Sequence, residues 1–406
     1  MFSGRIEETE SIKQSLLQAK LGNPRHFLVE GERGIGKSSL MLIANAFAHD
    51  KVDGRGELNF LPLEIELNEG TTYVELVRMV AAALQQKMSE QDHLKTKAKI
   101  AWEFLSKWNI LGVEYKGEQK EPIPSALVDD LANTIAGFMA DVGSQLDGLL
   151  LLIDEADKAD PATANLGEFV KLLTEKLTKR GCDRLCIGLA GLPVLVQKLR
   201  QGHESSLRIF DILMLEPLSD DEVESAIQRG LDEANEKNDK PTTIDADAMK
   251  MIVHLSEGYP HFVQQFAYCA FDKDINYKIE IDDVVRGAYQ ENGALDQLAR
   301  KYFQEMFYEK ISSEDYRKVL VGMATKLDQW QSRQDIIKVS GVADSQVTNA
   351  LAALKKKNII LANEEKKGEY RLPTKSFAVW LRAIDARKKR KTKEALHGAK
   401  PATDPS

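Results

Sequence analysis

Short apolar runs alternate with longer amphipathic stretches along the first half of the chain. Residues 148–153, GLLLLI, are apolar at almost every position, which is typical of a parallel strand buried on both faces. Residues 38–49, SSLMLIANAFAH, instead have the spacing of an amphipathic helix. Strands that alternate with helices predict an α/β fold, in which helices cover both faces of a parallel sheet. Other strand-like runs lie at residues 26–30, 58–67, 184–191 and 211–218.

The pattern changes after residue 218, where the strand-like runs stop. Ser219 and Glu222 have the spacing of a capping box and predict the start of a helix. The sequence from there to about residue 300 predicts an all-helical segment. Within the first half, less regular stretches predict a helix at residues 98–108, a hairpin or loop at 109–124 and another helix at 126–142.

Residues 333–373 have the pattern of a winged helix-turn-helix. A short helix (333–339) is followed by the turn GVAD and by a second helix, which we expect to begin near Asp344 as its N-cap. The second helix has an apolar face, and two short strands around a polar tip then form a hairpin. The apolar face consists of Val347, Leu351 and Leu354, and the residues outside it include Gln346, Asn349, Lys355 and Lys356.

Composition excludes several classes of protein. The chain has 406 residues, of which 43% are hydrophobic and 29% charged, an ordinary globular balance. It has no apolar run long enough to span a bilayer and no secretory signal, and its three cysteines form neither a disulfide framework nor a set of metal ligands. We therefore expect a soluble cytoplasmic protein. The predicted domains are residues 1–217 with the sheet, 218–305 all helical, 306–388 with the winged helix, and a disordered basic tail at 389–406.

Charge is distributed unevenly along the chain. Residues 313–406 contain 20 Lys and Arg against 11 Asp and Glu, a net charge of +9. The whole chain carries −8, so the preceding 312 residues carry −17. An acidic body with a basic C-terminal end favours a nucleic-acid partner for that end.

The segment GERGIGKS, residues 31–38, lies between a predicted strand and a predicted helix. It fits the pattern G-x-x-x-x-G-K-[ST] of a phosphate-binding loop. Backbone N–H groups at the start of the helix would hold phosphates, Lys37 would reach the β- and γ-phosphates, and the Ser38 hydroxyl would bind Mg²⁺. The predicted nucleotide contacts are Gly31, Glu32, Arg33, Gly34, Ile35, Gly36, Lys37, Ser38 and Ser39.

The strand that begins at residue 148 ends in two carboxylates, Asp154 and Glu155. A carboxylate at the tip of a buried strand is costly unless a cation compensates it. We expect Asp154 to hold Mg²⁺ with Ser38, and Glu155 to polarise the attacking water. A core strand followed by a solvated acidic turn would explain the segment alone, but the phosphate loop makes an ATP hydrolysis site the better interpretation. A protein that binds ATP without appreciable turnover stays an alternative.

These two motifs, followed by a helical segment and a winged-helix-like domain, resemble the AAA+ ATPases. The resemblance covers about residues 1–385 and is strongest to the origin-recognition and Cdc6-like initiators and the related STAND-type ATPases. It implies that Gly4 and Arg5 lie near the adenine, although an ordinary helix start would also explain them. Where the family keeps a polar sensor residue, this chain has Ala190 and Gly191.

The resemblance also implies two further phosphate contacts. Arg208 is the candidate arginine finger toward the next subunit, or else a surface or interdomain salt-bridge residue, with Arg180, Arg184 and Arg200 as lesser candidates. His261 stands where many relatives have an arginine in the second sensor, and a solvated histidine at a helix N-terminus is the alternative.

The winged-helix pattern at the C-terminal end predicts DNA as the partner. With residues 344–356 in a major groove and Lys366, Lys367 and Arg371 on phosphates, residues 344–371 would bind DNA. Protein docking by the same domain is the alternative. The sequence thus predicts an ATPase, with ATP and Mg²⁺, that acts as a homo-oligomeric switch on DNA, or alternatively a STAND-like signalling or defence ATPase that docks a partner protein. We expect no contact with a membrane.

Overall fold

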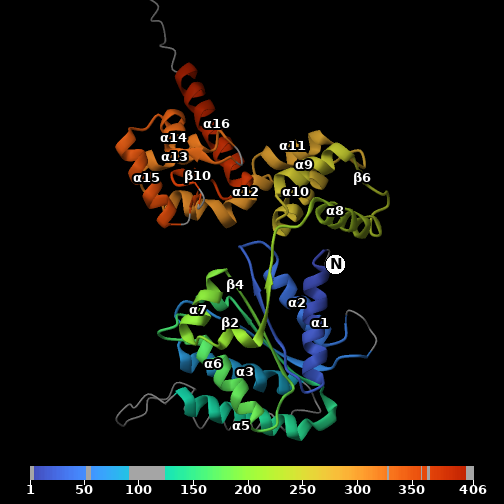
Figure 1. Ribbon diagram of the computed structural model, residues 1–406. Helices are drawn as coiled ribbons and strands as arrows, with labels where there is room; N and C mark the ends of the chain where they lie inside the picture. The colour runs from blue at the N-terminus through green and yellow to red at the C-terminus, as the bar shows by residue number, and fades with distance from the viewer. Residues whose placement is uncertain are drawn as a thin grey trace, which may run out of the picture. The chain divides into compact units, whose positions relative to one another are not determined.

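The chain folds into two compact units, an N-terminal unit that ends at Glu216 and a C-terminal unit that begins at Pro217 (Figure 1). The computed structural model describes residues 4–51, 56–90, 124–326, 329–357, 359–363 and 366–398. The helix expected at 98–108 lies outside these residues, as does the loop expected at 109–124 except for Pro124. No helix in the described part of the chain is both long and apolar enough to cross a membrane.

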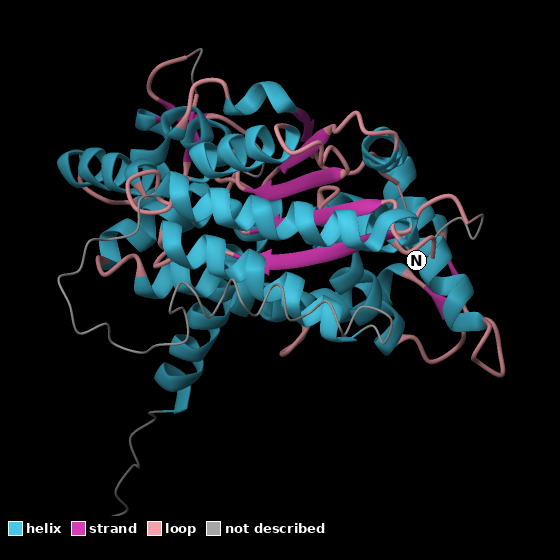
Figure 2. Cartoon of the chain, turned by 90° about the horizontal axis from the view of Figure 1, so that it is seen from below, coloured by secondary structure: helices cyan, strands magenta, loops and turns pink. Residues whose placement is uncertain are grey.

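A five-stranded parallel sheet forms the centre of the N-terminal unit, as the alternating pattern predicts (Figure 2). Its two most apolar strands are buried along almost their whole length and lie inside the sheet, whereas Pro62, which lacks a backbone donor, lies in an edge strand. The strand order is β2-β3-β4-β1-β5, with β1 (His26–Glu30), β2 (Phe60–Glu66), β3 (Gly148–Asp154), β4 (Leu185–Gly191) and β5 (Phe210–Met214).

Helices cover both faces of this sheet (Figure 1). One layer packs with the sheet into a continuous apolar core that includes Val77, Phe138 and Phe169, while the other layer packs on the opposite face. The first layer consists of α3 (Tyr73–Glu90), α5 (Pro124–Val142), α6 (Leu166–Thr178) and α7 (Val194–Gly202), and the second of α1 (Ile6–Lys20) and α2 (Lys37–Ala48).

The C-terminal unit begins with helices, and the predicted capping box is present. The Ser219 side chain accepts the N–H of Glu222, and the Glu222 carboxylate accepts the N–H of Ser219. The helices are α8 (Asp220–Asn235), α9 (Ala246–Ser256), α10 (Pro260–Lys273), α11 (Ile281–Tyr289) and α12 (Ala294–Leu298), followed by π-helical turns at Ala299–Phe303 and Glu305–Glu309.

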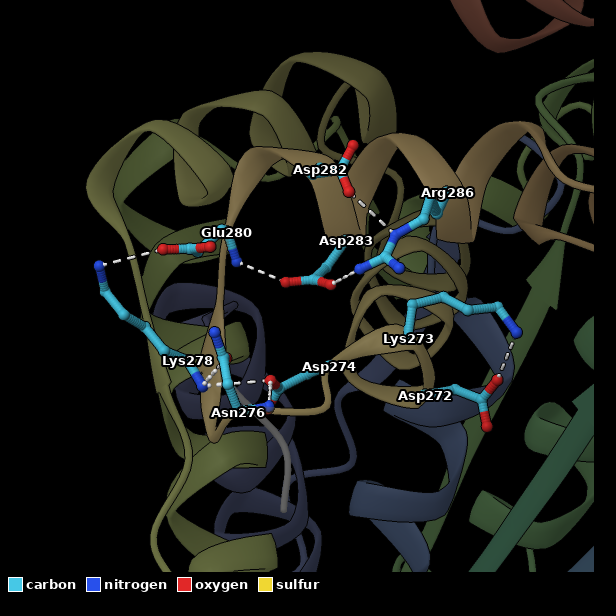
Figure 3. Close-up of polar contacts among 9 residues, drawn as sticks. All are labelled: Asp272, Lys273, Asp274, Asn276, Lys278, Glu280, Asp282, Asp283 and Arg286. Carbon is cyan, nitrogen blue, oxygen red and sulfur yellow. Dashed lines mark hydrogen bonds and ion pairs between the residues drawn. The ribbon is translucent and has the colours of Figure 1, made fainter.

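The expectation that this segment is entirely helical is wrong at one place. Two short strands, β6 (Thr243–Ile244) and β7 (Lys278–Ile279), pair in parallel. Figure 3 shows the polar contacts around β7: the Asp274 carboxylate accepts the N–H groups of Asn276 and Lys278 and so shapes the turn before the strand. The Lys278 ammonium also lies 2.9 Å from Asp245, just after β6. Backbone hydrogen bonds between the two segments and the burial of Ile279 in the core complete the pairing.

The last part of the unit combines helices with a three-stranded sheet. Ser332 accepts the N–H of Asp335 and caps α14, and the expected apolar face of α15 is buried. Asp344, however, is not the N-cap: it is the first residue of α15, and its carboxylate pairs with Arg333. The elements are α13 (Glu314–Met323), β8 (Gln331–Ser332), α14 (Arg333–Ser340), α15 (Asp344–Lys356), β9 (Leu361–Ala362), β10 (Glu369–Arg371) and α16 (Lys375–Gly398), with strand order β8-β10-β9.

The basic tail differs from the expected disorder. Helix α16 continues to Gly398, so residues 389–398 are helical, and residues 399–406 lie outside the described part. Phe377, Trp380 and Leu381 bury the start of this helix in the core of the unit. Once a helix has been anchored, a continuation rich in Lys, Arg, Ala and Leu can extend it, because these residues have high helix propensity.

Candidate nucleotide site

The phosphate loop joins the end of β1 to the start of α2. Three of its positions are glycine because a larger side chain would clash there or would strain the backbone. A Cβ on Gly31 would come within 2.8 Å of the Ile35 side chain and 3.2 Å of the Leu215 carbonyl oxygen. Gly34 and Gly36 have φ angles of 80° and 105°, in the left-handed region that favours glycine. The loop thus makes a tight turn, and α2 begins directly after it, at Lys37.

Lys37 curls back over this loop. Its ammonium donates to the carbonyl oxygens of Gly31 and Glu32 at 2.9 and 3.0 Å. Burial lowers the pKa of Lys37, while the negative charges of four neighbouring carboxylates oppose that shift. The four, in order of their effect, are Asp157, Glu155, Asp154 and Glu32.

The side chains of Ser38 and Asp154 form a hydrogen bond at the edge of the sheet. The Ser38 hydroxyl donates to Oδ2 of Asp154 at 2.7 Å, although the two residues belong to α2 and β3. The other oxygen, Oδ1, accepts the N–H of Glu155 at 2.7 Å. A hydroxyl beside a carboxylate fits Mg²⁺, which typically takes one or two protein oxygens and completes its octahedron with water and phosphate oxygens. Among the described residues, no group of three or more His, Cys, Asp or Glu forms a metal cage.

Glu155 has a left-handed backbone, with φ of 51°. For a residue other than glycine this conformation costs about 1–3 kcal/mol, and it is found at functional sites more than elsewhere. The turn places the Glu155 side chain just beyond the end of β3, 3.3 Å from the Lys158 ammonium. The Glu155 side chain is 40% exposed and therefore accessible to water.

Asp157 is a site residue that our sequence reasoning did not single out. It lies in the 3₁₀ turn Ala156–Lys158 after β3, its side chain is buried, and its Oδ1 accepts the N–H of Leu192 just after β4 at 2.9 Å. The sequence does contain a signal: the fourth letter of DEAD is acidic, and the strand that pairs beside it ends in Gly191. A glycine at position 191 does not by itself indicate that the Asp157 carboxylate lies where a side chain of residue 191 would be.

The structure brings Arg5 to the phosphate loop. Its guanidinium is buried and donates to the carbonyl oxygens of Ile35, in the loop, and of Glu216, at the end of the unit, while Glu8 pairs with it at 3.3 Å. Arg5 and Gly4 both have left-handed backbones. An adenine contact for these two residues stays a prediction.

The arginine candidates differ in their surroundings. Arg208 is exposed in the 3₁₀ turn Ser206–Ile209 and has no ion-pair partner among the described residues. Arg180 pairs with Asp129 at 3.0 Å, and Arg184 donates to two backbone carbonyls, so both act within the unit. Arg200, near the end of α7, is exposed as Arg208 is. The role of Arg208 as an arginine finger stays a prediction.

His261 lies in the C-terminal unit, at the start of α10. Its ring is 3.4 Å from the Lys301 ammonium, and burial together with that positive charge lowers its pKa. The lowered pKa favours the neutral ring, which weakens any attraction to phosphate. Its expected contact with the nucleotide stays a prediction.

Comparison with known proteins agrees with this geometry. Residues 2–180 match the family model described as the AAA ATPase domain. The match covers less than half of the chain, so the likeness concerns these residues alone. This likeness supports ATPase activity, as the two motifs and the resemblance predict. No curated protein matches the chain in sequence.

Two solved structures extend the likeness in fold over both units of the chain. The Walker-type ATPase of Pyrococcus abyssi is 20% identical, with a TM-score of 0.54 over 94% of this chain and 96% of that chain. The ORC2 protein of Aeropyrum pernix, solved as ADPNP–ADP complexes, is 13% identical, with a TM-score of 0.53 over 96% of both chains. At these identities the likeness establishes the fold alone.

Proposed function

We propose that the AAA domain binds ATP with Mg²⁺ on residues 31–39 and hydrolyses it with Asp154 and Glu155. The contact between Ser38 and Asp154, at 2.7 Å, carries this proposal. It joins the phosphate loop to the carboxylate at the end of β3, so the groups proposed for phosphate binding and for hydrolysis lie at one edge of the sheet. The relative solved as ADPNP–ADP complexes supports the choice of an adenine nucleotide.

Each residue has a distinct task in this mechanism. The N–H groups at the start of α2 hold the phosphates, and Lys37 exchanges its loop carbonyls for β- and γ-phosphate oxygens. Ser38 and Asp154 would hold Mg²⁺, which neutralises the phosphate charge that builds up during hydrolysis. Glu155 accepts a hydrogen bond from the attacking water and orients it toward the γ-phosphate.

The test compares the wild type with Glu155→Gln. We expect ATP hydrolysis to fall by about 100-fold or more, since the amide cannot act as a base, while ATP affinity is retained. Asp160→Asn, which changes an exposed carboxylate beyond the same turn, is the matched control and should hydrolyse ATP normally. Turnover of ATP by Glu155→Gln at the wild-type rate would contradict the assignment.

We further propose that residues 306–388 form a winged helix that binds DNA through residues 344–371. Gln346 and Asn349 are exposed on α15, and such amides can read base edges. Lys355 and Lys356 are exposed at its end, and Lys366 and Lys367 between β9 and β10, where they can meet phosphates. The net charge of +9 over residues 313–406 supports this partner.

ATP binding would then control assembly and DNA binding. Arg208, which is exposed and has no ion-pair partner among the described residues, would act on the ATP of a neighbouring copy and make the oligomer depend on ATP. Hydrolysis would remove the γ-phosphate and release that contact. The protein would thus be a nucleotide-dependent switch on DNA.

One observation favours the alternative, a STAND-like ATPase with a protein partner. Ile281, Val285 and Tyr289 are exposed at 48%, 37% and 39%, at helical spacing along α11. A stripe of exposed apolar side chains is typical of a surface that contacts another protein. ATP hydrolysis that depends on Glu155 but ignores DNA would favour this function.

A further inference from the structure

Asp157 is a buried carboxylate at the edge of the sheet where the phosphate loop lies. A buried carboxylate needs hydrogen-bond partners to offset the loss of water. Its Oδ1 accepts the N–H of Leu192 at 2.9 Å, and its backbone carbonyl oxygen accepts the Lys198 ammonium from α7. These bonds fasten the turn after β3 to the connection between β4 and α7, through Leu192, and to α7 itself, through Lys198.

Gly191, the last residue of β4, leaves the space that this carboxylate fills. A Cβ at Gly191 would lie 2.8 Å from Oδ1 of Asp157 and 3.0 Å from its backbone nitrogen. The glycine is therefore needed for close approach, since any side chain would push the carboxylate away. The two residues fit together as a pair.

The end of β4 also holds the phosphate loop. The Gly31 N–H donates to the Gly191 carbonyl oxygen at 3.3 Å. Among the carboxylates that favour the charged form of Lys37, Asp157 has the strongest effect. Asp157 thus belongs to the turn that carries Glu155 and contacts the end of β4, which in turn is bonded to the phosphate loop.

We propose that Asp157 is a positioning residue for ATP hydrolysis. Its bond to Leu192 fixes the turn after β3 against the end of β4, and thereby holds Glu155 in its left-handed conformation opposite the phosphate loop. Asp157 acts through Glu155. Displacement of a catalytic group by about 1 Å can cost a factor of about 100 in rate, so a small movement of this turn would be measurable. The inference rests on the proposed role of Glu155.

The test uses Asp157→Ala and Asp157→Asn in the full chain. For each variant we would measure the melting temperature, the affinity for a fluorescent ATP analogue, and kcat and KM for ATP. In Asp157→Ala we expect kcat to fall about tenfold or more, with analogue affinity and KM within about twofold of the wild type. Asparagine keeps an oxygen that can accept the Leu192 N–H, so Asp157→Asn should stay within about threefold of the wild-type kcat.

Gly191→Ala tests the same contact from β4 and leaves the charge of Asp157 intact. Its Cβ should displace the carboxylate and lower kcat as Asp157→Ala does, so the proposal stays testable if either variant fails to fold. A folded Asp157→Ala with wild-type kcat, a loss in affinity instead of kcat, or equal losses in Asp157→Asn and Asp157→Ala would each overturn it. Glu155→Gln distinguishes failure of the proposed function from failure of this inference. If Glu155→Gln hydrolyses ATP normally, the proposed function fails. If Glu155→Gln is inactive but the Asp157 variants are normal, only the role of Asp157 fails.

Discussion

Single polar groups at the ends of strands carry the chemistry proposed for this protein. Ser38 and Asp154 come within 2.7 Å because parallel strands end at a common edge and the helix after β1 begins there. Glu155 has a strained backbone at the same edge. The other end of β1 carries a different buried polar group, His26, which concerns stability rather than catalysis.

His26 predicts an acid-sensitive N-terminal unit. The side chain is only 3% exposed, and burial lowers its pKa from 6.5 to about 4. Its Nδ1 accepts the N–H of Ile187 at 3.2 Å, which requires that nitrogen to be unprotonated. Between these two pKa values the unfolded chain binds a proton that the folded chain does not, so stability is complete above about pH 6.5 and is lost as the pH falls toward 4.

We expect this residue to account for a loss of about 2–3 kcal/mol in the free energy of unfolding between pH 7 and pH 4.5. Urea unfolding of the wild type and of His26→Gln at both pH values measures it, because glutamine can accept the same N–H without titrating. The wild type should lose more stability than the variant by that amount. Equal losses in the two proteins would show that His26 does not cause the acid sensitivity.

At the scale of elements, the structure links the phosphate loop to the C-terminal boundary of its unit. Arg5, just before α1, donates to Ile35 in the loop and to Glu216 after β5. One side chain thus bonds both to the phosphate loop and to the last residue of the unit. In the other unit, the hairpin of β9 and β10 presents basic residues, and Arg371 stacks on Trp330 with 4.9 Å from the guanidinium to the ring centre.

Lys366 and Lys367 predict a salt-dependent contribution to DNA binding. Replacement of both by alanine should weaken binding to double-stranded DNA of any sequence. The plot of log affinity against log salt concentration should become shallower by about two, since each phosphate contact contributes about 0.9 to its slope. Fluorescence anisotropy over a salt series measures both effects.

Lys237 and Lys240, exposed after α8, make a matched control pair for this experiment. Their double alanine variant removes the same charge from a different surface of the C-terminal unit. If both double variants weaken binding equally, the effect comes from net charge, and the hairpin is not the contact.

The sequence predicts those parts of the molecule that depend on neighbouring residues in the chain. The apolar run of β3 and the motif at residues 31–38 are such parts, and the structure places each as predicted. Asp157 was missed because its environment depends on Gly191, which only the pairing of β3 with β4 brings near. The pair β6 and β7 was missed because two-residue strands have too few positions for an alternating pattern.

At the scale of the whole molecule, the proposed ATP site and the excess of basic residues belong to different units. The phosphate loop belongs to the N-terminal unit, whereas the basic residues of 313–406 belong to the C-terminal unit. If the protein is a switch, ATP bound to the N-terminal unit must change the affinity of the C-terminal unit for DNA. ATP affinity and DNA affinity are therefore expected to depend on each other, because coupling between two binding sites is reciprocal. If bound DNA also favours the assembled state in which Arg208 reaches the ATP, it should raise the rate of hydrolysis as well.

The rate of ATP hydrolysis with and without double-stranded DNA, at low and at moderate salt, tests this coupling most directly. Glu155→Gln identifies the part of the rate that belongs to the proposed site. We expect DNA to stimulate hydrolysis by the wild type, the stimulation to weaken as salt rises, and the variant to show neither. Glu155-dependent hydrolysis that is the same with and without DNA at both salt concentrations would contradict the switch on DNA and favour the protein-docking alternative.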